Sequence, residues 1–251
     1  MPARVYAVAN QKGGVGKTTT AVNVGACLAE AGERVLLVDL DPQANATSGL
    51  GLRANGVSTH DLLDGAPLRD IVRPSGLANL DVVMAKSDLA TAAVELSARD
   101  GGERYLAEAL AGELEPYSFV FLDCPPSFGP LTVNALAAAT RALVPVQAEY
   151  YALEGLSQLL GTINLVKARL NPELAVAGIL LTMADGRTRL AAEVEAELRR
   201  HFNELVFTTT VPRSVRLAEA PSHGLPAIAY DRRSAGAQAY WKVAMELVER
   251  S

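Results

Sequence analysis

The sequence is poor in cysteine and has no long apolar run. Only two cysteines are present, Cys27 and Cys124, and neither lies in a CxxC pair or beside a histidine. This small number excludes a disulfide framework, and the spacing does not fit a zinc site. We therefore expect two reduced structural thiols. The apolar run Ala175–Leu181 is far too short to cross a bilayer.

Positive charge is also scarce. Lysine and arginine number 23 against 28 acidic residues, which gives a formal net charge of −5. This balance excludes a protein whose whole surface is basic, so any nucleic-acid contact would depend on a local patch. The acidic excess is uneven, because residues 1–125 carry 10 basic and 16 acidic side chains while residues 126–251 carry 13 and 12. The C-terminal half is therefore the better place for such a patch.

The composition does support a large buried core, since 49% of the residues are hydrophobic and 20% are charged. Short β-branched runs alternate with longer helical patterns from end to end, which is typical of βαβ units. We predict an α/β fold whose mostly parallel, twisted sheet has helices on both faces. No linker or repeat divides the chain, so residues 1–251 are expected to form one domain.

The pattern also places the individual elements. The expected strands are Val5–Ala9, Arg34–Asp39, Leu80–Met84, Ser118–Asp123, Ala142–Gln147, Val176–Met183 and Leu205–Phe207. The expected helices are Thr18–Ala31, Gly102–Gly112, Pro130–Ala139, Leu153–Leu170, Leu190–Phe202 and Ala235–Glu249. The region Leu50–Asp100 is interpreted as an insertion whose internal arrangement the pattern does not determine. The first residues lead directly into a strand without a signal peptide, which predicts a cytoplasmic protein.

A glycine-rich turn follows the first expected strand and opens a helix. It reads Lys12-Gly13-Gly14-Val15-Gly16-Lys17-Thr18-Thr19. Backbone N–H groups and the helix N-terminus together bind phosphate oxygens in this position, so the turn predicts a nucleotide site. Lys17 would reach the β- and γ-phosphates, and the Thr18 hydroxyl would coordinate Mg²⁺. The general P-loop pattern has a glycine where Gln11 stands, so the match to that pattern is incomplete.

Two of the expected strands end in aspartates. One strand ends at Asp39, with Asp41 two residues later and on the same side, and another ends at Asp123 after four apolar residues. The carboxyl ends of parallel strands lie at the edge of the sheet where ligands bind. Either aspartate alone could be a helix cap. Two of them beside a P-loop favour a catalytic interpretation, with Asp123 in the Walker B position near Mg²⁺.

These motifs resemble those of ParA-type chromosome-partitioning ATPases of the short, Soj-like kind, within the MinD/ParA group that carries a deviant Walker A box. The matching stretches are Lys12–Thr20, Asp39–Asn45, Asp123–Ser127, Val146–Gly155 and Val211–Gly224. The resemblance covers residues 4–250 and implies an ATPase that hydrolyses ATP to ADP and phosphate with Mg²⁺. Longer relatives carry an N-terminal helix-turn-helix that binds an operator, and no such extension is expected here.

The resemblance implies that the active form is a dimer. Lys17 would hold phosphates of its own protomer, whereas Lys12 would reach the nucleotide of the opposite protomer. Gly13 would allow the close approach at the dimer interface. A cation supplied in trans has the role of an arginine finger, so hydrolysis should require the dimer.

The resemblance also implies roles for the remaining site residues. Asp41 would polarise the attacking water. Mg²⁺ and its water shell would be held by Thr18, Asp39 and Asp123. The nucleotide-binding residues would be Lys12, Gly13, Gly14, Val15, Gly16, Lys17, Thr18, Thr19, Pro212 and Arg213, the last two of them near the adenine.

Contact with DNA is implied for two arginines, Arg187 and Arg216, at positions where relatives touch the DNA backbone. The resemblance thus implies an ATP-bound sandwich dimer that binds double-stranded DNA without sequence preference. A ParB-type centromere-binding protein would stimulate hydrolysis and so release the DNA, and the protein would be associated with the nucleoid. For Arg199 and Arg200, which alternate with glutamates, a solvated helix face is an equally good interpretation.

Two other functions compete with this interpretation. A MinD-like ATPase would bind membranes through an amphipathic C-terminal helix, but residues 235–251 carry two basic and two acidic side chains and no basic excess. We therefore expect that helix to dock onto the domain, without stable membrane association. A metabolic kinase or an iron–sulfur protein is the second alternative, although two scattered cysteines cannot hold a cluster.

Overall fold

A seven-stranded sheet forms the centre of the molecule. The structure is a computed structural model and describes residues 2–149, 152–185 and 189–250. The strands are β1 (Arg4–Val8), β2 (Val35–Asp39), β3 (Arg73–Pro74), β4 (Leu80–Val83), β5 (Phe119–Asp123), β6 (Arg141–Gln147) and β7 (Ala175–Thr182). Their spatial order is β3-β4-β2-β5-β1-β6-β7, and all pairs are parallel except β3 with β4. The predicted α/β class is therefore confirmed.

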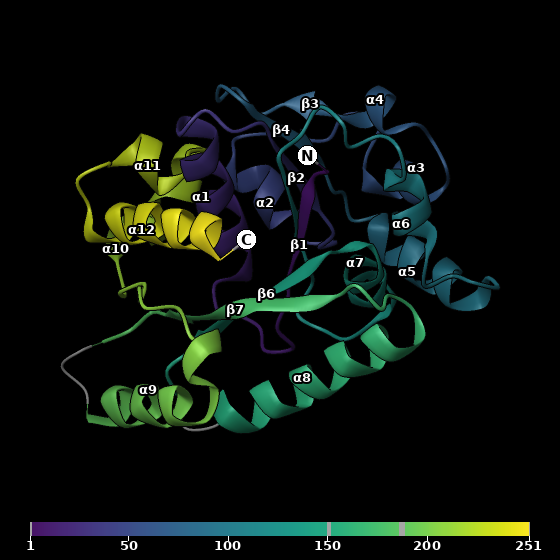
Figure 1. Cartoon of the computed structure of the whole chain (residues 1–251). Coiled ribbons are helices and arrows are strands. Elements are labelled where there is room, and N and C mark those ends of the chain that lie inside the picture. The colour runs from purple at the N-terminus through teal and green to yellow at the C-terminus, as the bar shows by residue number, and fades with distance from the viewer. Residues whose placement is uncertain (1, 150–151, 186–188, 251) are drawn as a thin grey trace.

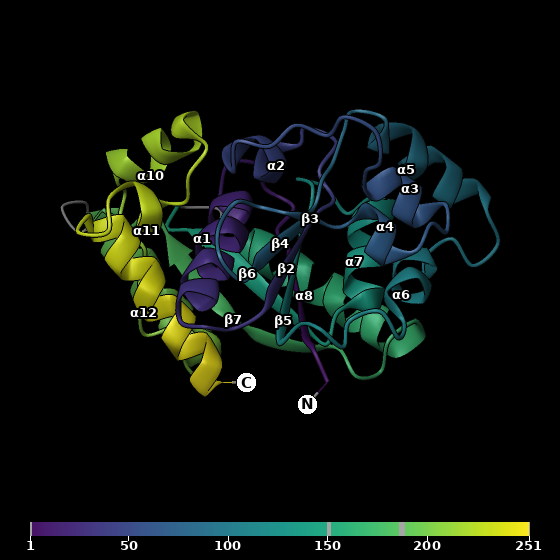
Figure 2. The same cartoon turned by 90° about the horizontal axis from the view of Figure 1, so that it is seen from above.

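Helices cover both faces of the sheet. The longer ones are α1 (Lys17–Glu30), α5 (Leu89–Ala98), α7 (Pro130–Ala138), α8 (Ala152–Arg169), α9 (Arg189–Phe202) and α12 (Ala235–Glu249). The shorter ones are α2 (Asn45–Gly49), α3 (Thr59–Leu63), α4 (Leu68–Ile71), α6 (Tyr105–Leu110), α10 (Val215–Glu219) and α11 (Ala227–Tyr230). Seen from above, α1, α11 and α12 lie on one side of the strands, and α3, α5, α6 and α7 lie on the other (Figure 2).

Every strand except the exposed two-residue β3 contributes side chains to both cores. In β1, Val5 and Ala7 pack in the core beneath α7 and α8, whereas Tyr6 and Val8 pack in the core beneath α1 and α12. The ring of Tyr6 stacks on Phe121 of β5, with the centroids 5.4 Å apart. This alternation has the period of two expected of a strand. Because both faces are buried, the strands appear in the sequence as continuous apolar runs.

The expected strand Leu205–Phe207 is wrong. A short 3₁₀ turn spans Asn203–Leu205, and only one parallel bridge, from Val206 to Ile179, joins the segment to β7. The N–H groups of the next two residues, Thr208 and Thr209, donate instead to the Glu246 carboxylate of α12, at 2.7 and 3.0 Å. These two N–H groups cannot also donate to a neighbouring strand, so the segment does not continue as a strand.

The interpretation of Leu50–Asp100 as an insertion is also wrong. Strand β4 lies within this region and pairs in parallel with β2, one strand in from the β3 edge of the sheet, and Leu62 of α3 and Leu89 of α5 are completely buried. Helices α3 and α4 have only five and four residues, which is too short for a periodic apolar signal. The other expected elements are present with small shifts in their ends, the largest being at α6, which begins at Tyr105 rather than Gly102.

Two further expectations concern the cysteines and the membrane. Cys27 and Cys124 are both free and buried, as predicted. Among the helices that the structure describes, none combines the length and the apolar character needed to span a bilayer.

Candidate nucleotide site

The P-loop connects β1 to α1 at the carboxyl edge of the sheet. Gly14 and Gly16 have φ angles of 76° and 86°, in the left-handed region that glycine adopts without steric cost. The Thr182 hydroxyl at the end of β7 donates to the Val15 carbonyl at 2.8 Å. The loop is therefore held open by its glycines and tied to a neighbouring strand.

Lys17 lies inside this loop. Its side chain is buried, and its Nζ donates to the Lys12 carbonyl at 3.1 Å. Burial lowers the pKa of Lys17, while the negative charges of Asp123 and Asp41 act in the opposite direction. A buried ammonium group costs free energy until an anion compensates it. The position therefore suits a phosphate group.

Asp39 and Asp123 lie side by side at the ends of β2 and β5, in register and fully buried. Asp39 already uses both of its oxygens. One accepts from the backbone N–H of Asp41 at 3.1 Å, and the other accepts from the N–H and the hydroxyl of Thr47 at 2.9 and 2.7 Å. Burial raises the pKa of Asp39 to about 6. Its contacts anchor the chain that follows β2, so a direct role in holding the metal stays a prediction.

Asp123 is in the opposite situation. Among the described residues, neither of its carboxylate oxygens has a hydrogen-bond partner. Burial and the nearby charge of Asp39 raise its pKa well above the usual range, although the Thr18 hydroxyl and Lys17 act against this shift. A buried carboxylate without partners is costly, and a divalent cation beside it removes that cost. Asp123 and Thr18 therefore fit Mg²⁺, which prefers oxygen ligands.

Asp41 borders the cleft that the P-loop forms. The carboxylate is 7% exposed and accepts from the Gln43 N–H at 2.9 Å. The cleft has a volume of about 490 Å³ and is lined by Gly13, Gly14, Gly16, Lys17, Thr18, Thr19, Asp41, Gln43, Asn45, Ser48, Gly49, Pro126, Met183 and Pro221. The structure thus brings Asp41 together with the loop glycines, Lys17, Thr18 and Thr19 around one cavity, which Lys12 and Val15 do not line.

A second pocket continues from this cleft. It has a volume of about 180 Å³ and is lined by Gly16, Thr19, Thr182, Met183, Val211, Pro212, Arg213, Ser214, Leu217, Ala218 and Tyr240. Gly16, Thr19 and Met183 border both cavities. A polar phosphate end thus leads into a more apolar end of the kind that takes a flat ring. Pro212 and Arg213 line this second pocket, and their position near the adenine stays a prediction.

Met183 and Tyr240 are pocket residues that the sequence reasoning missed. Met183 follows β7 and has a φ of 50°, unusual for a residue other than glycine. Tyr240 comes from α12, and its hydroxyl lies 3.1 Å from Thr20 Oγ1 on α1. The position of Met183 at a carboxyl strand end was a usable signal. No local signal marked Tyr240, because the sheet topology brings α12 against α1.

Lys12 differs from Lys17 in its surroundings. Its side chain is 51% exposed and pairs with Glu149, which is also partly exposed. Lys12 is not among the residues that line the nucleotide cleft of its own chain. An exposed ion pair contributes little free energy, so Lys12 is free to exchange Glu149 for another anion.

The structure describes one of the two arginines that were predicted to contact DNA. Arg187 lies outside the described residues. Arg216, in α10, is 52% exposed and pairs with Glu219 at 2.8 Å and with Asp231 at 3.4 Å. The guanidinium group is therefore at the surface, where a phosphate would have to replace these carboxylates.

The C-terminal helix is docked onto the domain, as expected. Tyr240, Ala244 and Leu247 of α12 are buried in the core that α12 shares with α1, and the two helices lie side by side in Figures 1 and 2. The apolar side of α12 is therefore already covered by protein.

Comparison with known proteins gives one consistent result. Residues 3–176 match the family model described as an AAA domain. The chain is 51% identical to the sporulation initiation inhibitor protein Soj of Bacillus subtilis (strain 168), over 97% of this chain and 98% of that protein. It is 56% identical to the chromosome-partitioning ATPase Soj of Thermus thermophilus, over 98% of this chain and 96% of that protein.

Solved structures show the same fold, one of them with nucleotide bound. A structure titled cobyrinic acid a,c-diamide synthase from Mycobacterium smegmatis, with bound ADP and magnesium, has a TM-score of 0.85 and 39% identity, over 98% of this chain and 94% of that one. The cell division ATPase MinD of Pyrococcus furiosus has a TM-score of 0.82 and 27% identity, over 99% of this chain and 100% of that one.

Proposed function

Since this chain belongs to the ParA/Soj family of chromosome-partitioning ATPases, we propose that its ATP-bound form is a sandwich dimer that binds double-stranded DNA without sequence preference. The chain is an ATPase that uses Mg²⁺. Hydrolysis, stimulated by a ParB-type centromere-binding protein, separates the dimer and releases the DNA. We place the protein on the nucleoid in the cytoplasm, without stable membrane association.

The position of Lys12 is the observation that carries the dimer proposal. Lys17 serves the phosphate site from inside, whereas the exposed Lys12 lies outside the cleft of its own chain. A Cβ atom on Gly13 would meet Pro126 at 3.7 Å, an ordinary contact, so Pro126 does not require glycine at this position. Close approach by a second protomer accounts for both features, because it needs space at Gly13 and takes Lys12 as a cation in trans.

Each site residue then has a defined part in hydrolysis. The P-loop N–H groups and Lys17 hold the phosphates, and the pocket around Pro212 and Arg213 holds the base. Thr18 and Asp123 would hold Mg²⁺, which would supply positive charge to the phosphate oxygens. Asp41 orients the attacking water and accepts its proton.

The DNA site is proposed at the surface that carries Arg216, with Arg187 as its second member. Two phosphate contacts per protomer give about four in a dimer, for which log K should fall by roughly 3.6 per tenfold rise in salt. A monomer has half of these contacts. Dimerisation by ATP is therefore enough to switch useful DNA affinity on, even though the net charge of the chain is −5.

The test is DNA binding as a function of nucleotide and salt. With ATP, we expect binding to DNA of any sequence, weakened about a hundredfold between about 50 and 200 mM salt. With ADP or without nucleotide, binding should be far weaker. Equal affinity in the three states would contradict the proposal.

Replacement of Arg216 by alanine tests the DNA surface separately. Removing one contact per protomer should reduce the salt slope by roughly 1.8 and lower the affinity at physiological salt by about tenfold or more. Arg69→Ala is the control, since Arg69 of α4 is an exposed arginine in the acidic N-terminal half, where no DNA contact is proposed, and pairs with Glu113 at 3.9 Å. The surface is assigned wrongly if both variants behave alike in fluorescence anisotropy titrations.

A further inference from the structure

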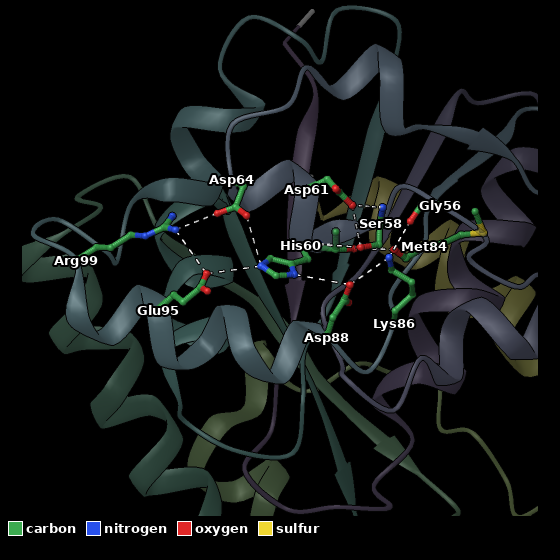
Figure 3. Close-up of polar contacts among 11 residues, drawn as sticks. Gly56, Ser58, His60, Asp61, Asp64, Met84, Lys86, Asp88, Glu95 and Arg99 are labelled. Carbon is green, nitrogen blue, oxygen red and sulfur yellow. Dashed lines mark hydrogen bonds and ion pairs between the residues drawn. The ribbon is translucent and has the colours of Figure 1, made fainter.

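A second cluster of charged side chains lies between α3 and α5, away from the residues that line the nucleotide cleft. His60 is in α3, and Asp64 follows one turn later. Glu95 is in α5, and Asp88 directly precedes that helix. Figure 3 shows the His60 imidazole between the three carboxylates.

The distances around the imidazole are compatible with ligation of a shared metal ion. His60 Nε2 lies 3.5 Å from Asp64 Oδ2 and 3.6 Å from Glu95 Oε2, longer than a normal hydrogen bond. The three ligand atoms all lie within 4.8 Å of one another. Ligand atoms about 2.0–2.1 Å from a tetrahedral zinc ion are about 3.3–3.5 Å apart. The two distances to His60 Nε2 are close to this separation, and the two carboxylates, within 4.8 Å of each other, would close toward it when a metal binds.

The second ring nitrogen supports the same conclusion. His60 Nδ1 faces Asp88 Oδ2 at 3.7 Å, and Lys86 Nζ holds that carboxylate oxygen at 3.1 Å. With its hydrogen on Nδ1, directed at this carboxylate, the imidazole would present the Nε2 lone pair to a metal ion, as in the carboxylate–histidine–zinc arrangement. Nε2 is buried and has no hydrogen-bond partner among the described residues. A lone pair directed at two carboxylates is unfavourable unless a cation lies between them.

The backbone that carries His60 is firmly held. The Ser58 side chain accepts from the His60 N–H at 3.3 Å, and the Asp61 carboxylate accepts from the Ser58 N–H at 2.7 Å, which forms a capping box. The Thr59 hydroxyl donates to the Asp39 carbonyl at 2.7 Å. The imidazole is thus presented by a fixed helix end, as a preorganised ligand should be.

The carboxylates around His60 outnumber the cations that contact them. Arg99 contacts Asp64 through Oδ1, at 3.0 Å, so that Oδ2 remains directed at His60. The same guanidinium group lies 3.5 Å from Glu95 Oε2, in an exposed contact that a metal ion bound to this oxygen would replace. Three carboxylates, Asp64, Asp88 and Glu95, face only two cations, Lys86 and Arg99, among the described residues. A neutral imidazole leaves one negative charge uncompensated.

We propose that His60, Asp64 and Glu95 bind a divalent transition-metal ion, with Asp88 as the residue that positions the imidazole. One imidazole nitrogen and two carboxylate oxygens are a ligand set for zinc-like ions, which leaves a position for water. The ion joins α3 to α5. It is separate from the Mg²⁺ that accompanies the nucleotide.

The experiment measures Zn²⁺ binding by calorimetry to the full chain without a histidine tag, with excess Mg²⁺ and ADP to occupy the nucleotide site. We expect one Zn²⁺ per chain, and a loss of affinity of about 100-fold or more in His60→Asn. His201→Asn is the matched control, because His201 pairs only with Glu197, at 3.4 Å, among the ion pairs of the described residues. That variant should bind Zn²⁺ as the wild type does.

Two more variants keep the test decisive if His60→Asn folds poorly. Glu95→Gln changes a partly exposed ligand and should also weaken binding, while Asp88→Asn should weaken it by about 10-fold or more through the second ring nitrogen. Co²⁺ should give the visible absorption of a four-coordinate site in the wild type and not in Glu95→Gln. Equal Zn²⁺ affinity in wild type, His60→Asn and Glu95→Gln would overturn the proposal and leave a protonated imidazole as the cation.

Discussion

Replacing Lys12 by alanine should lower the rate of ATP hydrolysis by about 10³-fold or more, because the variant loses a cation that acts on the transition-state charge. ATP binding should change little, since Lys12 does not line the cleft of its own chain, whereas Lys17 does. Phosphate release measures the rate of hydrolysis, and titration with a fluorescent ATP analogue measures ATP binding. Glu149→Gln is the control, because it removes the partner of Lys12 while leaving the lysine in place.

A mixing experiment decides whether Lys12 acts in trans. In a dimer of Lys12→Ala and Asp41→Ala protomers, one site combines an intact Asp41 with the Lys12 of its partner. Random pairing of equal amounts should therefore restore about a quarter of the wild-type rate, given two-fold symmetric dimers. If each protomer used its own Lys12, no site would be complete and mixing would restore nothing.

The second large effect is expected at Asp41. Asp41→Ala should lower turnover by about 10²–10⁴-fold, the contribution of a positioned general base, while ATP and DNA binding are retained. Because the carboxylate borders the cleft and is almost fully buried, its removal affects the reacting centre directly. Single-turnover hydrolysis and DNA binding with ATP are the two measurements. Wild-type hydrolysis in this variant would refute the role.

Asp41→Asn separates chemistry from loop structure. The asparagine side chain keeps an oxygen that can accept the Gln43 N–H, so the local turn is preserved. An amide cannot take a proton from water in the same way, so turnover should fall as in Asp41→Ala. A near-normal rate in Asp41→Asn would show that this carboxylate holds the loop and does not act on water.

The parts of the fold that were predictable have strong local patterns. The strands of the central sheet other than β3 are continuous apolar runs, since both of their faces are buried, and the longer helices other than α5, which was not predicted, repeat their apolar residues over several turns. Helices of four or five residues, such as α3 and α4, give no such signal. The run at Leu205–Phe207 has strand-like composition, but tertiary contacts of Thr208 and Thr209 with Glu246 removed the donors that a ladder would use.

The candidate site, too, was only partly predictable from the sequence. The P-loop and the aspartates at strand ends were visible because their chemistry depends on adjacent residues and on the rule that parallel strands end at one edge. Tyr240 and Met183 reach the base pocket from distant segments, and no local pattern connects them with the loop. The different states of Asp39 and Asp123, one with its oxygens occupied and one without partners among the described residues, also depend on three-dimensional neighbours.

The sequence by itself determined the α/β class, the phosphate loop and the excess of negative charge in the N-terminal half, because each is a property of adjacent residues or of composition. Only the tertiary structure decided which atoms meet. It placed Lys12 outside the cleft and Lys17 inside it, and it brought His60 of α3 to Glu95 of α5. Contacts of this kind depend on how helices pack on the sheet, which short stretches of sequence do not specify.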